Sequence, residues 1–440
     1  LSMTYDTLQT FRSEAYQHLS RARDATFELL DAVMTTRQVY SFAELSQSPL
    51  FHRRWSSAYE AIQDSRPQRQ KLMRLYLQHM ETPASGQIVL AGDHTAWSRP
   101  DAQRLPERTY EHQAPGAGGG SAVTVGQGYS TLAWIPEDSG SWALPLRHER
   151  ITSWESPIMK GVWQLKQVCR YLPTRPLSVW DSEYGCASFV LKSAEIEADR
   201  LMRLRSNRNV WGAPPPYPGR GRPRVHGDKF KLNDDTTWWS PDDEMEMQHP
   251  RLGRLRMRCW RTLHFRQAAA HPLNLIQVQR LDETGTPRSC RPLWLAWLGQ
   301  TMPALDVICS CYLRRFALEH GYRFLKQRLH WTLPKFGSTP AAERWSDLMP
   351  LALWQLWLAR QHVRDAPLPW QKPMTSMSPG RVADSIAPLL AQLGSPARPP
   401  KPRGKSPGWS KGRPRNRKPV CPLVRKSPKR KKKKTHKNAV

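Results

Sequence analysis

Long apolar runs and paired cysteines are both missing from this chain. No stretch of 18 or more apolar residues occurs in its 440 residues, so we expect no transmembrane helix. The first residues, LSMTYDTLQTFRSEAY, lack the basic-then-apolar layout of a secretory signal peptide. The seven cysteines form no C-x-x-C pair, which argues against a zinc site and favours reduced thiols in a cytosol.

Acidic residues are scarce as well. The chain has 37 Asp and Glu against 67 Lys and Arg, which gives a net charge of +30 and a pI of about 10.3. This charge predicts a polyanionic partner, with nucleic acid as the first candidate and an anionic membrane surface as the second. Residues 395–440 contain 18 Lys or Arg, nine Pro and no acid. They cannot bury a core, so we predict a disordered polybasic tail there.

The rest of the chain has the pattern of an α/β protein preceded by helices. Residues 1–82 show apolar residues at helical spacing, and we predict an all-helical N-terminal region for DNA binding or dimerisation. Residues 83–203 contain three strand patterns, then a helix and a returning strand; these are SGQIVLAGDHTAW, SAVTVGQGYSTLAWIP, SWALPLRHERI, SPIMKGVWQLKQVCRYL and RPLSVWDSEYG. Three hairpin-connected strands, a helix and a returning strand predict an α/β sheet of the ribonuclease-H type.

The sheet pattern is interrupted after residue 203. Residues 204–300 are predicted to be a β-rich insertion, from strand patterns such as RLGRLRMRCWRTLHFR and LNLIQVQRL. Within it, PGRGRPRVHGDKF has the composition of a flexible phosphate-binding segment, although a solvated linker explains it equally well. Residues 301–394 are predicted to return to the ribonuclease-H-like core and to end in C-terminal helices.

Three acids stand out by their positions. Asp93 ends the strand pattern IVLAGD, Asp181 ends LSVWD, and Glu319 is the only acid on a basic helix predicted over residues 311–331. Sheets of the predicted type bring the ends of their first and fourth strands together, beside a helix. Converging carboxylates bind Mg²⁺ or Mn²⁺, and two such ions can activate water and stabilise a leaving oxygen. The structural alternatives are turn or cap roles for the two Asp and salt bridges within the helix for Glu319.

The basic helix places four functional groups on one face. They are the phenol, guanidinium, carboxylate and ammonium groups of Tyr312, Arg315, Glu319 and Lys326. Their offsets of 0, 3, 7 and 14 residues fall within about 60° of one another at 100° per residue. Basic groups beside a metal-binding acid suit a site that holds a phosphate backbone against metal ions.

This spacing resembles the Tyr-Arg-Glu-Lys signature of bacterial insertion-sequence transposases of the DDE class. The two Asp stand in the order and the strand contexts of that group, and a β-rich insertion separates Asp181 from Glu319, as it does there. The resemblance covers roughly residues 85–335. It implies cut-and-paste movement of an insertion sequence, by metal-dependent strand cleavage and strand transfer.

The resemblance also implies a metal site and a set of partners. Asp93, Asp181 and Glu319 would be the catalytic residues and would bind two Mg²⁺ ions, with Mn²⁺ as a substitute. The substrate would be double-stranded DNA, both at the transposon ends and at the target. The protein would work as a homodimer in the synaptic complex, away from the membrane, in the cytoplasm and nucleoid of a bacterium.

DNA contacts are implied for two further groups of residues. Tyr312, Arg315 and Lys326 would bind DNA beside the metal site. Trp294 or Trp297, in the insertion, would hold a flipped base. The alternative for both tryptophans is a place in the core, because alternating Trp and Leu are common in buried strands.

Two other functions use the same features. A ribonuclease-H-like nuclease would need the three acids but would not join DNA ends, and a catalytically inactive DNA-binding transposase derivative would need only the positive charge. A polybasic membrane-surface protein is a weaker alternative, because it gives a Trp-rich α/β core no role. Near the acids, His94 and Ser182 are candidates to support the metal ligands, and Glu183 is an alternative ligand to Asp181.

Overall fold

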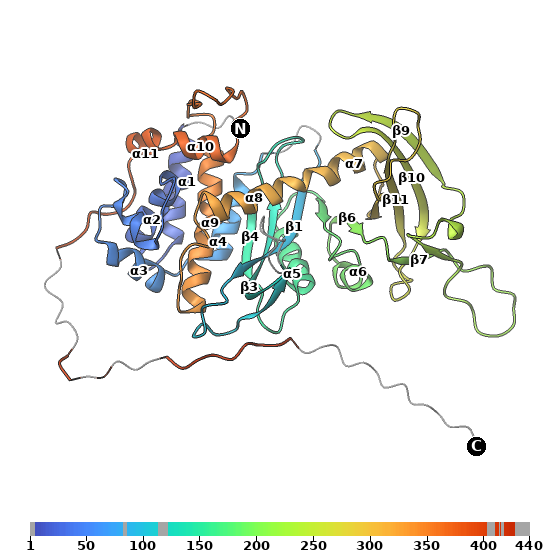
Figure 1. Cartoon of the computed structure of the whole chain (residues 1–440), viewed down its shortest axis with the longest axis horizontal. Helices are drawn as coiled ribbons and strands as arrows, with labels where there is room; N and C mark the ends of the chain where they lie inside the picture. Colours follow the sequence, from blue (N-terminus) through green and yellow to red (C-terminus); the bar gives the residue numbers. More distant parts are fainter. Residues whose placement is uncertain are drawn as a thin grey trace, which may run out of the picture.

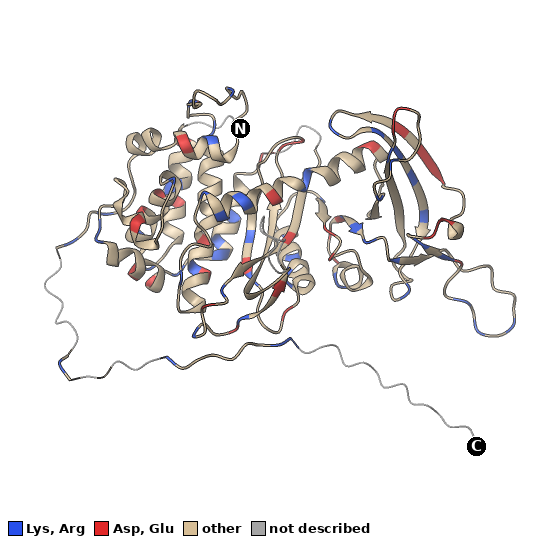
Figure 2. Cartoon of the chain, in the orientation of Figure 1, with Lys and Arg blue, Asp and Glu red and all other residues tan. Residues whose placement is uncertain are grey.

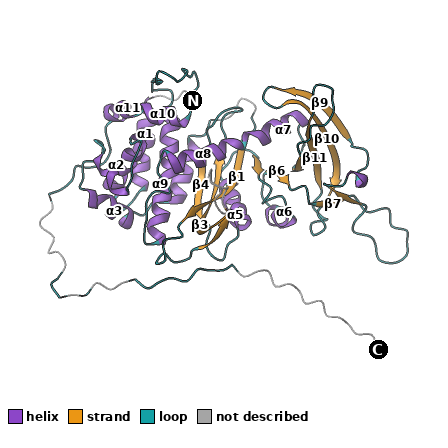
Figure 3. Cartoon of the chain, viewed as in Figure 1, coloured by secondary structure: helices purple, strands orange, loops and turns teal. Residues whose placement is uncertain are grey.

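The computed structural model forms an elongated molecule, with helices gathered at one end and a long sheet running toward the other (Figure 1, Figure 3). In the part of the chain that the structure describes, no helix is long and apolar enough to cross a membrane. The structure describes residues 5–81, 86–112, 122–402, 410–412, 414 and 418–426.

Four α-helices and a 3-10 helix precede the sheet: α1 (Tyr5–His18), α2 (Arg23–Thr35), η1 (Phe42–Gln47), α3 (Trp55–Asp64) and α4 (Arg69–Gln78). They pack around α9 (Thr339–Ala359), which is buried throughout from residue 345 onward. Arg12 ties three helices together, because its guanidinium donates to Asp31 of α2 at 2.8 Å and to Gln355 of α9 at 2.5 Å. The N-terminal helices therefore share one hydrophobic core with later parts of the chain.

A single mixed sheet of ten strands forms the centre of the molecule. Its order is β2-β3-β1-β5-β6-β12-β11-β10-β9, and β4 pairs with β3 beside this path. The strands are β1 (Val89–Ser98), β2 (Thr109–His112), β3 (Val123–Trp134), β4 (Leu144–Arg150), β5 (Leu177–Trp180), β6 (Asp199–Leu204), β9 (Asp243–His249), β10 (Gly253–Leu263), β11 (Leu273–Arg280) and β12 (Leu293–Leu298). A separate hairpin pairs β7 (Asn209–Trp211) with β8 (Lys229–Lys231).

The first half of the sheet has the arrangement expected from the sequence. β1 runs antiparallel to β3 and parallel to β5, and β5 runs parallel to β6. The run LSVW of β5 is buried at all four positions, as is typical of a parallel strand covered on both faces. This mixed α/β sheet is compatible with a ribonuclease-H-like core.

Close packing sets the position of β1 against β5. The helices α5 (Pro157–Cys169) and α6 (Ala187–Ser193) lie beside these strands, and the ring of Trp180 packs over Gly92. A Cβ atom at Gly92 would lie only 2.0 Å from that ring, so only glycine fits at this position. The residues that follow Gly92 and Trp180 are thereby held at the same level of the sheet.

The strands of the predicted insertion continue the central sheet. β12 pairs antiparallel with β6, with Trp297 opposite Leu201, and β11, β10 and β9 follow in turn. Four strands of the segment after residue 204 therefore extend the same sheet, and only the β7–β8 hairpin is separate from it among the described residues. β6 pairs in parallel with β5 on one side, and its other edge is free to pair with a strand of either direction. β12 uses that edge in the antiparallel direction.

The helix predicted over residues 311–331 is wrong in its boundaries. The chain forms α7 (Leu305–Arg314) and α8 (Phe316–Gln327), which run end to end across the sheet (Figure 1). At the junction, the Arg315 N–H donates to the carbonyl of Tyr312 at 3.1 Å, which is the tighter three-residue spacing of a 3-10 turn. The predicted helix is thus two helices joined at Arg315.

The C-terminal part contains two short helices, α10 (Pro379–Ser385) and α11 (Ala387–Leu393). Beyond them, the described residues contain no helix or strand. Residues 418–426 are nevertheless attached to the body, since the N–H groups of Cys421 and Val424 donate to the carbonyls of Gln103 and Arg108, each at 2.9 Å. The prediction of a disordered tail does not hold for this segment, and much of the remaining tail lies outside the described residues.

Candidate active site

Asp93 and Asp181 lie side by side in the sheet. Gly92 of β1 is opposite Trp180 of β5 in a parallel pair, and each acid is the next residue along its strand. Asp181 directly follows β5, as expected. Asp93 does not end its strand, because β1 continues to Ser98 through antiparallel pairing with β3. The two acids converge where β5 stops and leaves the neighbouring edge of β1 open.

Asp93 is held through both its carboxyl group and its backbone. The backbone N–H of His94 donates to Asp93 Oδ1 at 2.7 Å, and the hydroxyl of Tyr322 donates to the Asp93 carbonyl oxygen at 3.0 Å. Burial raises the pKa of Asp93, and the nearby charge of Asp181 adds to that shift, while His94 and Arg315 oppose it. Asp93 therefore sits where a second positive charge would stabilise its ionised form.

Asp181 has an oxygen with no hydrogen-bond partner. Its Oδ1 atom is buried and receives no hydrogen bond from any residue that the structure describes, and the guanidinium of Arg203 lies 3.9 Å away. Leaving a buried carboxylate oxygen unsatisfied is costly, so such atoms mark places where a cation or water belongs. The side chain is about one third exposed, which leaves it open to a ligand from solvent.

Arg315 occupies the space between the acids. Its Nη1 atom lies 3.4 Å from Asp93 Oδ2, and its Nη2 atom donates to Glu319 Oε1 at 2.5 Å. Burial alone would lower the pKa of Arg315, but Tyr312 and the three acids together raise it above its ordinary value. The guanidinium is almost fully buried and stays charged, so it neutralises part of the acidic cluster.

Glu319 differs from the two Asp in exposure and in partners. Its side chain is 49% exposed, and it pairs with Arg315 four residues earlier. This is the salt bridge that the structural alternative predicted. Among the described residues, no three Asp, Glu, His or Cys side chains are grouped closely enough to hold a metal ion. The structure thus brings Asp93 and Asp181 together and leaves Glu319 on the far side of a guanidinium.

The other residues on the helix face are turned inward. Tyr312 is 2% exposed, its hydroxyl finds no hydrogen-bond partner in the described part of the chain, and burial raises its pKa. The ammonium of Lys326 donates to Thr95 Oγ1 of β1 at 2.7 Å, and burial lowers its pKa. Together with Arg315, these side chains contact protein groups in this conformation, so their predicted contacts with DNA remain predictions.

Trp294 and Trp297 are parts of the core. They are 1% and 3% exposed, and the Trp294 ring packs against Trp238 and Trp260 at centroid distances of 5.2 and 5.8 Å. Neither indole is exposed for stacking on a base in this conformation, so the role of either one in holding a flipped base stays a prediction. The pattern of alternating Trp and Leu therefore reflects a buried strand.

Sequence reasoning missed Arg203, the cation nearest to Asp181. Its guanidinium is half exposed, and Arg205, two residues later on the same side of the chain, pairs with Glu183 at 2.6 Å. Glu183 is held in this pair and its side chain is 45% exposed, so its carboxylate is engaged with Arg205 in this conformation. The signal was available in the run RLMRLR, in which Arg203 and Arg205 are two residues apart at the end of β6, the strand next to β5.

The chain was compared with models of known protein families. A family model described as DDE superfamily endonuclease matches residues 14–267, which is more than half of the chain. The matched region begins within α1 and contains both Asp93 and Asp181, but it ends before α7, so Glu319 lies outside it. Comparison with curated proteins gives no match.

Proposed function

This chain belongs to the family of DDE superfamily endonucleases, and we propose that within this family it is a transposase. The proposed reaction is cut-and-paste movement of an insertion sequence, in which double-stranded DNA is cut at the element's ends and the freed 3′-hydroxyl attacks a target. The protein would act as a homodimer that holds two ends together, in the cytoplasm of a bacterium. Family membership supports a transposase-like nuclease, and the remaining details are part of the proposal.

One observation supports the proposal most directly. Asp93 and Asp181 come from strands that are far apart in sequence, yet they follow the paired residues Gly92 and Trp180 in adjacent parallel strands. Two carboxylates placed side by side repel each other, and a nearby cation offsets that repulsion. Arg315 provides part of that charge here. The site is therefore built for strong positive charge.

The residues fit a divalent metal ion, which enzymes of this superfamily generally use. Asp93 and Asp181 offer hard carboxylate oxygens, and Oδ1 of Asp181 has no hydrogen-bond partner. Glu319 is exposed enough to turn away from Arg315 and join them. We propose Mg²⁺, as two ions, with Mn²⁺ as a substitute. Bound there, the metal would activate water and stabilise charge on the scissile phosphate.

The other side chains bind and position the substrate. Arg203 is half exposed beside Asp181 and would hold a phosphate next to the scissile bond. Arg315 would orient the carboxylates in the free enzyme and turn toward the DNA backbone when Glu319 releases it. Tyr312 packs beneath this guanidinium, whose central carbon lies 5.9 Å from the Tyr312 ring centre. Lys326 would stabilise β1 next to Asp93 through its bond to Thr95.

One observation favours the catalytically inactive derivative. Glu319 is paired with Arg315 and lies outside the segment that matches the family, so the site has two acids in place and a third turned aside. In that alternative the chain binds DNA through its positive charge alone and has no metal-dependent activity. The plain nuclease is the remaining alternative, and it differs from a transposase only in failing to join ends.

A plasmid assay tests the proposal. The substrate is a supercoiled plasmid containing the DNA that flanks the coding region on both sides, incubated with the full chain and Mg²⁺ or Mn²⁺. We expect metal-dependent nicking and joined products, and we expect Asp181→Asn to abolish both while DNA binding persists. Glu183→Gln is the matched control, because it removes a nearby carboxylate whose one ion-pair partner among the described residues is Arg205. Nicking without joining would support the nuclease, and no metal-dependent nicking would support the inactive derivative.

A further inference from the structure

A loop between β7 and β8 projects from the far end of the molecule (Figure 1). Residues 213–225 of this loop are all exposed. Its base is firmly closed, because the Gly212 N–H donates to the Asp228 carbonyl and the Gly227 N–H donates to the Gly212 carbonyl, each at 3.0 Å. We call residues 212–227 the arm. It is an exposed extension on a fixed base.

The arm is strongly basic. No acid occurs between Asp199 and Asp228, although this stretch contains seven arginines. Three of them, Arg220, Arg222 and Arg224, lie at the tip, where Figure 2 shows Lys and Arg on the projecting loop. Within the described residues, none of these three guanidinium groups pairs with a carboxylate. The positive charge of the tip is therefore available to a partner.

The tip is also narrow. Gly219 and Gly221 have φ angles of +84° and +81°, which a residue with a side chain rarely adopts, and both have open space around them. The hydroxyl of Tyr217 donates to the Gly221 carbonyl at 2.9 Å and shapes the turn. Four prolines precede Arg220 and stiffen the arm by restricting its backbone. Two arginines are thus presented on either side of a residue without a side chain.

We propose that the arm inserts Arg220 and Arg222 into the minor groove of A/T-rich duplex DNA. A/T-rich tracts have a narrow minor groove with enhanced negative potential, and arginines inserted there are the usual readers of it. Gly221 lets the backbone approach the floor of the groove, where any side chain would collide. This inference rests on the proposed function for the identity of the partner, and it adds which DNA sequence the protein prefers.

The arm is connected to the candidate active site by a basic stretch of chain. Arg203 lies beside Asp181, and Arg205 and Arg208 follow it before the arm begins. Seventeen residues separate Arg203 from Arg220, and a fully extended chain of that length spans at most about 60 Å. At about 3.4 Å per base pair, the preferred A/T tract lies within about 17 base pairs of the cleavage site.

Binding experiments with the full chain in EDTA test the arm without any cleavage. The probes are 40-base-pair duplexes of equal length that differ in a central A/T-rich or G/C-rich tract. We expect wild-type protein to prefer the A/T-rich probe by about tenfold, the scale of one base-pair discrimination. Gly221→Val keeps every charge but obstructs the groove, so the preference should fall to about one while the salt dependence stays unchanged.

Charge-removing variants provide the matched control. Arg220→Ala with Arg222→Ala should also abolish the preference. Arg251→Ala with Arg291→Ala removes the same charge from two exposed arginines outside the arm and should preserve it. Equal binding of both probes by wild-type protein would overturn the proposal, as would loss of the preference in the control. Equal competition by double-stranded RNA, whose minor groove is wide and shallow, would also overturn it.

The binding ratio tests the role of the arm, and the plasmid assay tests the proposed transposase activity, so either proposal can be wrong without the other. If the chain prefers A/T-rich DNA through the arm but never nicks the plasmid, the proposed transposase activity is wrong and the role of the arm stands. If it nicks and joins DNA but Gly221→Val binds both probes as wild-type protein does, the role of the arm is wrong. Melting temperatures of all variants check folding, because a valine at Gly221 has open space around it but strains the local backbone, whose φ is +81°.

Discussion

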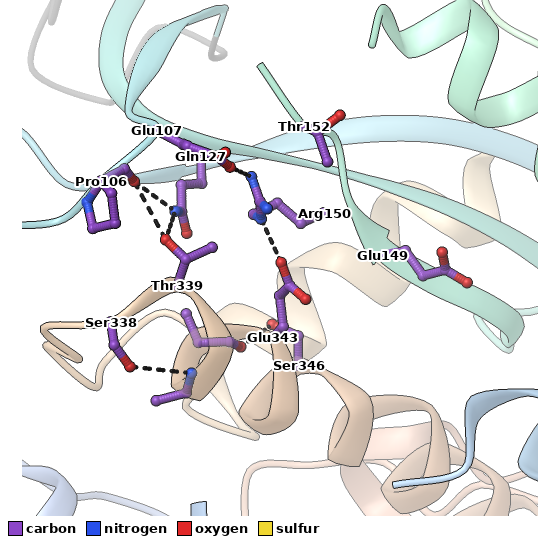
Figure 4. Close-up of polar contacts among 12 residues, drawn as sticks. Pro106, Glu107, Gln127, Glu149, Arg150, Thr152, Ser338, Thr339, Glu343 and Ser346 are labelled. Atoms are coloured by element: carbon purple, nitrogen blue, oxygen red, sulfur yellow. Dashed lines mark hydrogen bonds and ion pairs between the residues drawn. The ribbon is translucent and has the colours of Figure 1, made fainter. Parts of the chain in front are cut away.

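Two clusters of acids and arginines in this molecule differ in how completely they are paired. In the network between β4 and α9, Arg150 bridges Glu343 and Glu107, each at 2.6 Å, and Gln127 donates to Thr339 at 3.1 Å (Figure 4). At the candidate active site, Asp181 has an oxygen without a hydrogen-bond partner, and Glu319 is half exposed. The first cluster is complete in itself, whereas the second leaves room for another cation.

This difference separates acids that hold the fold together from acids that are available for chemistry. The acids of the network are held by α4, α9 and β4, and Asp347 also pairs with Arg69 at 2.6 Å. Their ion pairs connect the helical end of the molecule to the sheet. At the candidate active site, by contrast, the single buried guanidinium of Arg315 serves all three acids, Asp93, Asp181 and Glu319. Both clusters contain acids and arginines, and they differ in how many cationic partners each acid has.

The largest expected effect is on catalysis. Asp181→Asn keeps the size of the side chain and removes a metal-binding oxygen, so plasmid nicking should fall by about 1,000-fold, or about 4 kcal/mol of transition-state stabilisation. The free energy of unfolding, from urea titration, should change by less than about 0.5 kcal/mol, because Oδ1 of Asp181 makes no hydrogen bond. A variant that still nicks at the wild-type rate would remove Asp181 from the site.

The reverse result is expected in the network. Arg150→Met removes the cation that Glu343 and Glu107 share, while Glu343 keeps its pair with Arg69. Breaking these partly buried pairs should cost about 2 kcal/mol of unfolding free energy. Nicking per folded molecule should stay at the wild-type level. Urea unfolding and the plasmid assay on one preparation measure both. A stable variant with impaired nicking would show that the network acts on catalysis and would remove the contrast between the clusters.

A smaller effect concerns pH. Burial raises the pKa of Asp347 from 3.8 to about 7, against the opposing effect of Arg69. Between about pH 4 and pH 7, the folded state holds this proton and the unfolded state does not, so its contribution to the unfolding free energy falls as pH rises. The slope is at most about 1.4 kcal/mol per pH unit. Asp347→Asn should remove this pH dependence, which is measured as the unfolding free energy at a series of pH values. The same slope with pH in the variant and the wild type would contradict the prediction.

The smallest expected change is in the stability of Glu319→Gln. Glu319 is half exposed, so losing its pair with Arg315 should cost no more than about 0.5 kcal/mol. The same variant should lose metal-dependent nicking if Glu319 completes the metal site. Melting temperature and nicking are measured on one preparation. A small loss of stability with full nicking would show that Glu319 is only the partner of Arg315.

Much of the fold was predictable because it depends on short-range patterns. The apolar runs before Asp93 and Asp181 predicted two buried strands, and the order of elements predicted that their ends would meet. The register confirms the adjacency of Gly92 and Trp180, one residue before each acid. The continuation of β1 to Ser98 was not predictable in the same way, because it depends on pairing with β3 rather than on the local sequence.

The sequence by itself determined which groups share a side of an element, and tertiary structure decided how deep each one lies. Helical spacing placed Tyr312, Arg315 and Glu319 on one face, since that depends only on the rotation per residue. It contained no information on the distance between helix and sheet. Packing of α7 and α8 against the strands buried Tyr312 and Arg315 and left Glu319 exposed. The position of the guanidinium between the acids follows from that packing, because a long side chain takes the rotamer that its neighbours allow.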